Sequence, residues 1–154
     1  TNRISFIASS LADEENYVVA DFMTKDIVRI SLDASVLDTA KLMAKERVSS
    51  AVVTENHKLL GIITEKDLAR RIVATGLDPK ATKAKDVMTK NVITVEPETT
   101  LYKAMLILGE KKIKHLPIVN KGNVVGIITA MDILRVQPSY MEVMATPKAA
   151  AEAE

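Results

Sequence analysis

The sequence predicts a mixed α/β fold in which two βαββα units pack sheet to sheet with pseudo-twofold symmetry. The first observation is that the chain repeats itself at an offset of 65 residues. The second is that each repeat alternates short β-branched runs, typical of strands, with segments of helical periodicity. The third is size, because a unit of about 60 residues does not easily bury its own apolar face. The two units are therefore expected to need each other.

The repeat is carried by blocks of identical residues that align without a gap. The alignment pairs Asp21–Lys25 with Asp86–Lys90, Gly61–Thr64 with Gly126–Thr129, Asp67 with Asp132, and Arg70 with Arg135. The first pair of blocks reads D-x-M-T-K, and the second reads G-I-I-T. Between the blocks the residues differ but the apolar positions persist, so the two repeats are expected to share one fold.

Each repeat is expected to open with a strand and a helix. The β-branched runs Ile27–Ile30 and Val92–Val95 predict strands. Helices are expected over Val36–Glu46 and Leu101–Lys111, where apolar residues recur with helical period. The expected N-caps are Ser35 for the first helix and Thr99 or Thr100 for the second.

Two more strands and a final helix complete each repeat. The expected strands are Ala51–Thr54, Leu59–Thr64, Leu116–Val119 and Val124–Thr129. Polar turns join them in pairs, which predicts hairpins, at Glu55–Lys58 and Asn120–Asn123. The last strand of each pair is apolar, which indicates burial on both faces. The closing helices are expected over Glu65–Thr75 and Ala130–Val136, with Gly76 and Pro138 as stops.

These elements divide the chain into five segments. They are an N-terminal extension over residues 1–18, a first unit over 19–76, a linker over 77–85, a second unit over 86–137 and a C-terminal tail over 138–154. The linker is short, so the units are expected to touch. The tail is rich in Ala, Glu and Lys and is expected to be partly disordered.

The composition excludes several classes of protein. The 154 residues include no cysteine, which excludes disulfides, thiolate catalysis and thiolate zinc sites. A net charge of +1 provides no global basic field for nucleic acid. No apolar run approaches the roughly 20 residues of a membrane span, and the given N-terminus lacks the charged-then-apolar pattern of a secretory signal, so we expect a cytoplasmic protein without a membrane partner. We find no nucleophile–base pair, metal-ligand set or P-loop, and we expect neither catalysis nor a catalytic cofactor.

The candidate binding residues lie where the last strand of each repeat meets the final helix, in Gly61–Asp67 and Gly126–Asp132. The start of a helix presents unpaired backbone N–H groups and the positive end of the helix dipole, both of which attract anions. A Thr hydroxyl there can bond a phosphate, and an Asp one turn later can accept both hydroxyls of a ribose. The motif therefore suits a nucleotide.

A helix cap is the alternative interpretation of the same residues. Thr-x-x-Asp is also a capping box, and Ser35 and Asp38 have the same spacing at another helix start. Two points favour more than a cap. Capping boxes prefer Glu or Gln to Asp, and the motif recurs in both repeats, whereas Ser35 and Asp38 are replaced by Thr100 and Lys103. Both roles can also alternate, with Asp capping the empty site.

The two repeats resemble the cystathionine-β-synthase (CBS) domain family, and the pair resembles a CBS tandem, or Bateman module. The resemblance rests on the D-x-M-T-K and G-I-I-T-x-x-D blocks and on His115–Val119, and it covers Val19–Val136. It implies CBS-type βαββα units, a disk-shaped homodimer, and clefts that bind AMP, ADP or ATP as regulatory ligands. The partner protein on which such a module acts is not identified by the sequence.

The resemblance also implies which residues form the clefts. Each cleft combines the Thr-x-x-Asp of one unit with the opening strand and second strand of the other, with Asp on ribose, Thr on phosphate and apolar strand residues on adenine. The implied first cleft consists of Thr64, Asp67, Thr89, Asn91, Val92, Ile93, Ile113, Lys114, His115 and Pro117. The implied second cleft consists of Thr129, Asp132, Thr24, Ile27, Val28, Val48, Ser49 and Ser50.

The two implied clefts differ in charge. The first has Lys114 and His115, which can meet phosphate charge, whereas the second has Ser49 and Ser50 at the corresponding positions. We therefore expect the first cleft to bind a phosphorylated ligand more tightly. His115 also has an interpretation as a partly buried strand residue.

Two functions remain open from the sequence. The first is a regulatory adenine-nucleotide sensing module without catalytic activity, which acts on a partner protein. The alternative is an interaction scaffold or nucleic-acid-binding protein whose Thr-x-x-Asp motifs are only helix caps. The arginines that follow the motifs fit either a phosphate contact or a solvated helix face, and they are Arg70, Arg71 and Arg135.

Overall fold

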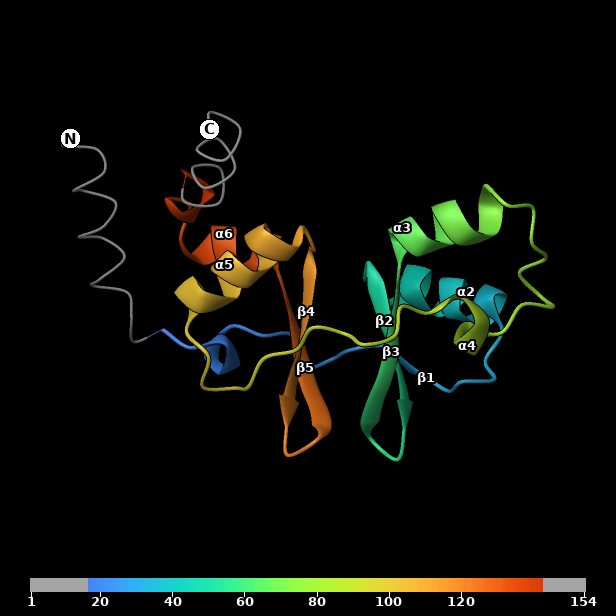
Figure 1. The fold of residues 1–154 in the computed structure, drawn as a ribbon, viewed down its shortest axis with the longest axis horizontal. Helices are drawn as coiled ribbons and strands as arrows, with labels where there is room; N and C mark the ends of the chain where they lie inside the picture. Colours follow the sequence, from blue (N-terminus) through green and yellow to red (C-terminus); the bar gives the residue numbers. More distant parts are fainter. Residues whose placement is uncertain (1–16, 143–154) are drawn as a thin grey trace. The chain divides into compact units, whose positions relative to one another are not determined.

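The computed structural model describes residues 17–142 and divides the chain into two compact units (Figure 1). The first compact unit consists of Lys25–Ile93 together with Asn120–Val124. The second combines Thr94–Val119 with the described residues before Lys25 and after Val124. The compact units therefore differ from the repeats. The opening segment of each repeat belongs to the compact unit that contains most of the other repeat. Most of the expected N-terminal extension and of the expected tail lies outside the described residues.

The first compact unit is built around a small sheet. β2 (Ser50–Glu55) pairs antiparallel with β3 (Lys58–Thr64), and β1 (Arg29–Ile30) pairs parallel with β2. The helix α2 (Val36–Glu46) supplies an apolar stripe that packs with the sheet residues. The resulting core is made of aliphatic side chains and methionine, among them Val36, Met43, Val53, Ile63 and Ile72.

The second compact unit contains the corresponding elements of the second repeat. They are α5 (Leu101–Lys111), α6 (Ala130–Val136), and β4 (His115–Asn120) and β5 (Asn123–Thr129) except for the ends that their hairpin joins, which belong to the first unit. β4 and β5 are neighbouring strands. Large aliphatic residues of these elements are fully buried, namely Leu101, Met105, Leu108, Leu116, Ile118, Ile128 and Ile133. With 3% aromatic residues in the chain, branched aliphatic and methionine side chains supply most of the core volume.

Three of the four expected helices are confirmed with the expected bounds, namely α2, α5 and α6. Ser35 and Thr100 cap α2 and α5, because each side chain accepts a bond from the backbone N–H three residues later, at 3.0 and 3.1 Å. The hairpins are also present. Burial of the last strand on both faces is continuous only in its G-I-I part, since Lys58–Leu60 of β3 are exposed or half-buried and in β5 only Val124 is buried before that part.

The expected opening strands are shorter than predicted. In the first repeat only Arg29–Ile30 form a strand, and in the second Val92–Val95 form none, with a single parallel bridge from Val95 to Ile118. The difference between the repeats has a physical cause. Val52 donates its N–H to the Val28 carbonyl at 2.9 Å, whereas the residue that corresponds to Val52 is Pro117, which has no N–H.

The helix expected over Glu65–Thr75 is also wound differently from the prediction. A single α-turn, α3 (Glu65–Asp67), continues into a π-helix, η2 (Leu68–Val73), in which Ala74 N–H bonds the Ala69 carbonyl five residues back. The periodicity did not predict two short helices that lie at the D-x-M-T-K blocks. η1 (Val19–Asp21) ends at the first residue of the first block, and α4 (Ala84–Val87) ends at the second residue of the second block.

The opening segments of the two repeats are exchanged between the compact units. We define the exchanged segments as Val19–Thr24 and Ala84–Thr89. Thr89 exchanges two backbone hydrogen bonds with Ile62 of β3, at 2.9 and 3.1 Å, and Thr24 exchanges two with Ile127 of β5, at 2.9 and 3.0 Å. Each D-x-M-T-K block therefore pairs with the G-I-I-T strand of the other repeat.

A methionine of each exchanged segment lies directly on a glycine of the strand that it meets. A Cβ on Gly61 would lie 2.5 Å from Met88 Sδ and 3.0 Å from the Thr89 carbonyl oxygen. A Cβ on Gly126 would lie 2.5 Å from Met23 Sδ. The glycine that opens each G-I-I-T block is thus required for close approach of another segment. Met23 and Met88 are thus packing residues.

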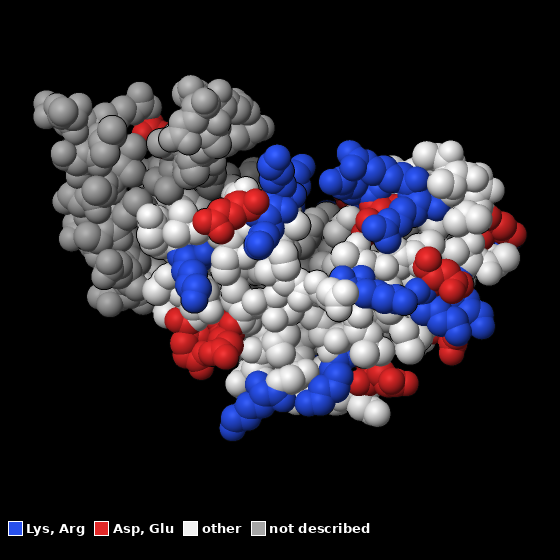
Figure 2. Space-filling view, in the orientation of Figure 1, with Lys and Arg blue, Asp and Glu red and all other residues white. Residues whose placement is uncertain are grey.

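The surface carries both signs of charge, and Figure 2 shows Lys and Arg interspersed with Asp and Glu on the face drawn. Lys85 and Lys83, near the start of α4, approach Asp33 Oδ1 at 3.2 and 3.5 Å. The hydrogen bond from Lys85 and the charges of both lysines hold the pKa of Asp33 below its ordinary value. Because all three side chains are exposed, these ion pairs are expected to add little to stability.

The close approach of Met88 to Gly61 predicts that Gly61→Ala destabilises the protein. The added methyl group overpacks the contact with the exchanged segment, and we expect a loss of about 1–3 kcal/mol in the free energy of unfolding. Urea unfolding measures the change. Gly109→Ala is the matched control, because no atom lies within 4 Å of a Cβ on Gly109 in α5. That variant should gain about 0.5–1 kcal/mol from helix propensity. Equal effects at the two glycines would contradict the packing argument.

Candidate functional site

The first Thr-x-x-Asp motif forms a complete capping box at the start of α3. Thr64 N–H donates to Asp67 Oδ2 at 2.9 Å, and Asp67 N–H donates to Thr64 Oγ1 at 3.4 Å. The Thr64 hydroxyl also donates to Asp67 Oδ2, at 3.1 Å. One carboxylate oxygen, Oδ2, therefore takes the capping bonds, while Oδ1 takes none of them.

The second motif forms the same box at the start of α6. Thr129 N–H donates to Asp132 Oδ2 at 2.9 Å, and Asp132 N–H donates to Thr129 Oγ1 at 3.1 Å. Both Asp residues are half-buried, so each carboxylate keeps access to solvent. As in the first motif, the capping bonds use Oδ2 and leave Oδ1 available as an acceptor.

The helices α2 and α5 are capped in one direction only. Ser35 and Thr100 accept from the third helical residue, and that residue makes no reciprocal side-chain bond to the cap. Within residues 17–142, the reciprocal box therefore occurs at the motif helices and at neither of these two. Helix capping by both motifs is confirmed as a local structure. Whether the motifs also bind a ligand is a separate question.

The exchanged segments bring one further predicted residue beside each motif. Thr89 pairs with Ile62, two residues before Thr64, and belongs to the same compact unit as Thr64 and Asp67. Thr24 pairs with Ile127, two residues before Thr129. Each compact unit by itself therefore assembles the Thr-x-x-Asp of one repeat with the Thr of the other repeat's D-x-M-T-K block.

The start of the second strand also borders the motif of its own repeat. The Ser49 carbonyl accepts from Glu65 N–H at 3.0 Å, and the Lys114 carbonyl accepts from Ala130 N–H at 3.2 Å. Ser49 thus lies beside the first motif and Lys114 beside the second. The family resemblance implied instead that Lys114 belongs to the cleft of the first motif and Ser49 to the cleft of the second. These cleft assignments stay predictions.

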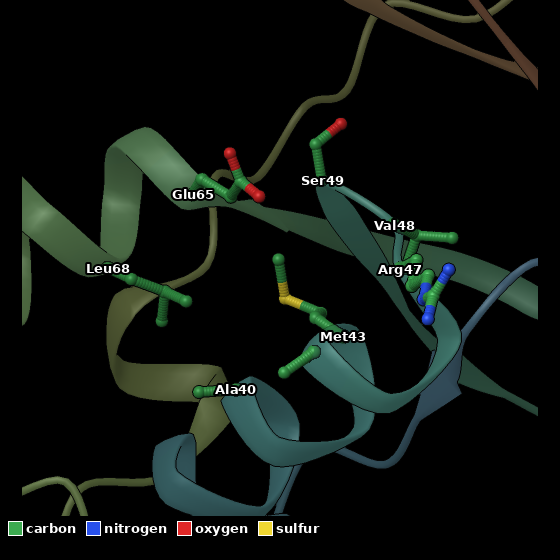
Figure 3. A pocket seen from close by; sticks show the side chains of 8 residues that line it. Ala40, Met43, Arg47, Val48, Ser49, Glu65 and Leu68 are labelled. Carbon is green, nitrogen blue, oxygen red and sulfur yellow. The ribbon is translucent and has the colours of Figure 1, made fainter.

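A cavity of about 480 Å³ lies next to the first motif, between α2, the start of β2 and α3 (Figure 3). Two predicted residues, Val48 and Ser49, line it, together with Ala40, Met43, Ala44, Arg47, Glu65 and Leu68. Figure 3 shows Met43 in the middle, with Ser49 and Glu65 on one side. Neither Thr64 nor Asp67 lines this cavity, so it differs from the implied clefts.

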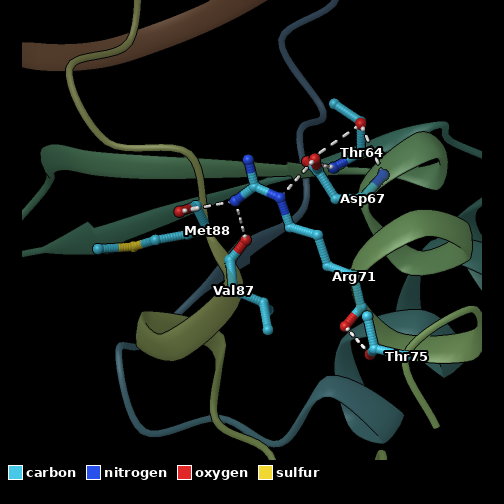
Figure 4. Close-up of polar contacts among 6 residues, drawn as sticks. All are labelled: Thr64, Asp67, Arg71, Thr75, Val87 and Met88. Carbon is cyan, nitrogen blue, oxygen red and sulfur yellow. Dashed lines mark hydrogen bonds and ion pairs between the residues drawn. The ribbon is translucent and has the colours of Figure 1, made fainter. Parts of the chain in front are cut away.

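Arg71 is the one motif-flanking arginine for which the described residues show polar contacts (Figure 4). Its Nε lies 3.6 Å from Asp67 Oδ1, and its Nη1 donates to the Val87 carbonyl at 2.8 Å and the Met88 carbonyl at 3.4 Å. Arg70 and Arg135 are exposed. The sequence showed that Arg70 and Arg71 follow the motif, but not that the Val87 and Met88 carbonyls would hold Arg71 beside Asp67.

The remaining predicted residues are distributed between the two compact units. The first contains Ile27, Val28, Val48, Ser49, Ser50, Asn91, Val92 and Ile93, and the second contains Ile113, Lys114, His115 and Pro117. Val28 and Ser50 are buried, and Asn91 adopts a left-handed backbone with φ of 52°. Their grouping into clefts with the motif of the other repeat stays a prediction.

Within residues 17–142, no group of three or more His, Asp and Glu side chains is placed to hold a metal ion. The helices in the same part of the chain are too short or too polar to cross a membrane.

Comparison with known proteins decides the family. The model of the CBS domain matches twice, over residues 19–74 and 84–139. The chain belongs to the CBS domain family. Its two matched regions form a tandem CBS pair, and its mixed α/β fold matches those of solved CBS-pair structures.

The relatives with similar sequences include uncharacterized proteins and CBS domain-containing proteins. An uncharacterized protein of Methanocaldococcus jannaschii is 34% identical over 125 residues, which cover 79% of this chain and 67% of that protein. The match spans 62% of the length of an uncharacterized protein of Methanopyrus kandleri and 52% of the length of the CBS domain-containing protein CBSX3 of Arabidopsis thaliana.

Two solved structures of similar CBS proteins carry ligands. CBSX2 in complex with AMP is 26% identical, has a TM-score of 0.67, and is matched over 78% of this chain and 95% of that chain. The CBS domain pair of protein MJ0100, in complex with 5′-methylthioadenosine and S-adenosyl-L-methionine, is 27% identical and has a TM-score of 0.70, with 77% and 98% covered.

The reciprocal cap predicts different stabilities for two Asp variants without ligand. Asp132→Ala removes the carboxylate that bonds the Thr129 N–H, and we expect a loss of about 1 kcal/mol in the free energy of unfolding. Asp38→Ala is the matched control, because Asp38 occupies the third position of α2 without a reciprocal bond. It should lose roughly 0.3 kcal/mol from the helix dipole alone. Urea midpoints measure both values, and a similar loss in the two variants would argue against a contribution from the box.

Proposed function

We propose that this CBS pair is a regulatory module that binds an adenosyl ligand, with AMP, ADP or ATP as the ligand class. The observation that carries the proposal is that similar CBS proteins hold AMP, S-adenosyl-L-methionine or 5′-methylthioadenosine. All of these ligands share an adenosine group. The residues that suit such a group in this chain are the Asp and Thr of each motif.

The geometry of the motifs supports this proposal. In both boxes the carboxylate is half-buried, and its Oδ1 is outside the capping bonds, so it can accept a ribose hydroxyl without loss of the cap. In both compact units an exchanged Thr lies beside the motif. We propose that Asp67 and Asp132 bind ribose hydroxyls, that Thr64 and Thr129 contact phosphate, and that the strand starts contact adenine.

The proposed module has no catalytic activity of its own and acts through a partner. Binding without turnover needs no nucleophile, and ligand binding can shift the population of conformations that a partner protein recognises. We propose that the chain functions as a homodimer and that the effector is another protein.

A second function is favoured by one observation, the complete capping boxes. Both Thr-x-x-Asp motifs have a structural role as helix caps. If capping is their whole role, the protein is an interaction scaffold or a nucleic-acid-binding protein. The mixed charges on the face in Figure 2 do not favour nucleic acid.

Calorimetric titration with AMP, ADP, ATP and S-adenosyl-L-methionine tests the proposal. We expect at least one of these ligands to bind, and we expect Asp67→Ala to weaken binding at the first site by roughly 1–3 kcal/mol, because hydrogen bonds to a charged group are lost. Asp38→Ala is the control and should bind as the unmodified protein does.

Two results would contradict the proposal. Unchanged affinity of Asp67→Ala, together with a lower melting temperature, would leave capping as the role of the motif. Flat isotherms with all four ligands, together with binding of RNA or DNA that weakens as salt rises, would favour the nucleic-acid alternative.

A further inference from the structure

Arg71 connects the first motif to the exchanged segment within one compact unit. Its guanidinium is held mainly by the segment, since the bond to the Val87 carbonyl is the shortest at 2.8 Å. Its Nε then lies 3.6 Å from Asp67 Oδ1, which makes an ion pair but not a close hydrogen bond. Asp67 is the more buried partner, with 14% of its side chain exposed against 48% for Arg71.

In this arrangement the Arg71 guanidinium compensates the charge of the Asp67 carboxylate, while Oδ1 of that carboxylate can still accept a hydrogen bond. Oδ2 accepts both bonds from Thr64, whereas Oδ1 faces Arg71 at a separation that keeps its lone pairs available. A positive charge at this distance attenuates the negative potential of the carboxylate, and the attenuation is strongest where water is partly excluded.

The second motif lacks this compensation. The residue that corresponds to Arg71 at the offset of 65 is Val136, which has no charge. Within residues 17–142, the side-chain bonds of Asp132 are those with Thr129. Two motifs with the same Thr and Asp therefore differ by one positive charge beside the carboxylate.

We propose that Arg71 is a specificity-determining residue of the first site, which favours phosphorylated over uncharged adenosyl ligands by compensating the charge of Asp67. The inference rests on the proposed function, because it concerns the ligand of that same site. A phosphate must approach a site that already contains a carboxylate. Without Arg71, that approach meets an uncompensated negative charge, whereas a neutral nucleoside does not experience the repulsion.

Titration with AMP and with adenosine tests this inference in a background in which the second site is weakened. In an Asp132→Ala background, we expect Arg71→Met to weaken AMP binding roughly fivefold at low salt and to change adenosine binding by less than about twofold. The effect on AMP should decrease as salt rises, because exposed charges are screened. Lys41→Met is the control for net charge, since it removes an exposed cation of α2 in the same unit.

Two further variants separate charge from a structural clamp. Arg71→Lys keeps a positive charge near Asp67 but loses the planar fork, so the ratio of AMP to adenosine affinity should remain close to that of the unmodified site. Arg71→Lys also keeps the inference testable if Arg71→Met does not fold. Val136→Arg in an Asp67→Ala background should raise the preference of the second site for AMP.

The possible outcomes distinguish this inference from the proposed function. Equal loss of AMP and adenosine binding in Arg71→Met would show a structural clamp and overturn the inference alone. Unchanged or tighter binding of AMP would also overturn it, while leaving the proposed function intact. If the unmodified protein binds neither AMP nor any other adenosyl ligand, the proposed function fails and the inference fails with it.

Discussion

The exchange of opening segments between the repeats is the interaction on which the rest of the structure depends. Each D-x-M-T-K block pairs with the G-I-I-T strand of the other repeat, and a methionine lies on a glycine where a Cβ has no room. Equivalent backbone hydrogen bonds hold the first residue of each exchanged segment. Val19 N–H donates to the Thr99 carbonyl and Ala84 N–H donates to the Ala34 carbonyl, both at 2.8 Å. Neither repeat therefore provides all of its own core, which is why the two must fold as a pair.

The same exchange assembles the candidate sites, and the caps give them a double role. Thr24 and Thr89 lie beside the motifs because their segments are exchanged. The Thr-x-x-Asp residues hold the first turn of a helix through Oδ2, an interaction worth about 1 kcal/mol, and Oδ1 lies outside these capping bonds. The capping and binding interpretations are therefore compatible for a single carboxylate.

The two motifs are alike, and the differences between the repeats lie in the residues around them. Arg71 places a cation beside Asp67, whereas Val136 occupies the corresponding position in the second repeat. In the second repeat, the backbone of Lys114 bonds the first residue of α6, whereas the first repeat has Ser49 there. The two motifs therefore differ in whether a cation contacts the Asp carboxylate.

The sequence by itself determined the repeat, the hairpins, three helices with their bounds, and the cap Ser35, because these depend on neighbours within a few residues. It left Thr99 and Thr100 open as the second cap, and the structure selects Thr100. It also identified the Thr-x-x-Asp boxes and their capping role, whereas their binding role stays a proposal. It did not determine that Val92–Val95 would lack a strand, because the missing N–H belongs to Pro117 in another segment. Nor did it select Arg71 over Arg70, because the Val87 and Met88 carbonyls that hold the Arg71 guanidinium belong to a distant segment of the chain. The exchange of the opening segments was implied by the family resemblance and not by the local pattern, since two nearly identical strands offer the same pattern and only long-range packing in the tertiary structure distinguishes them.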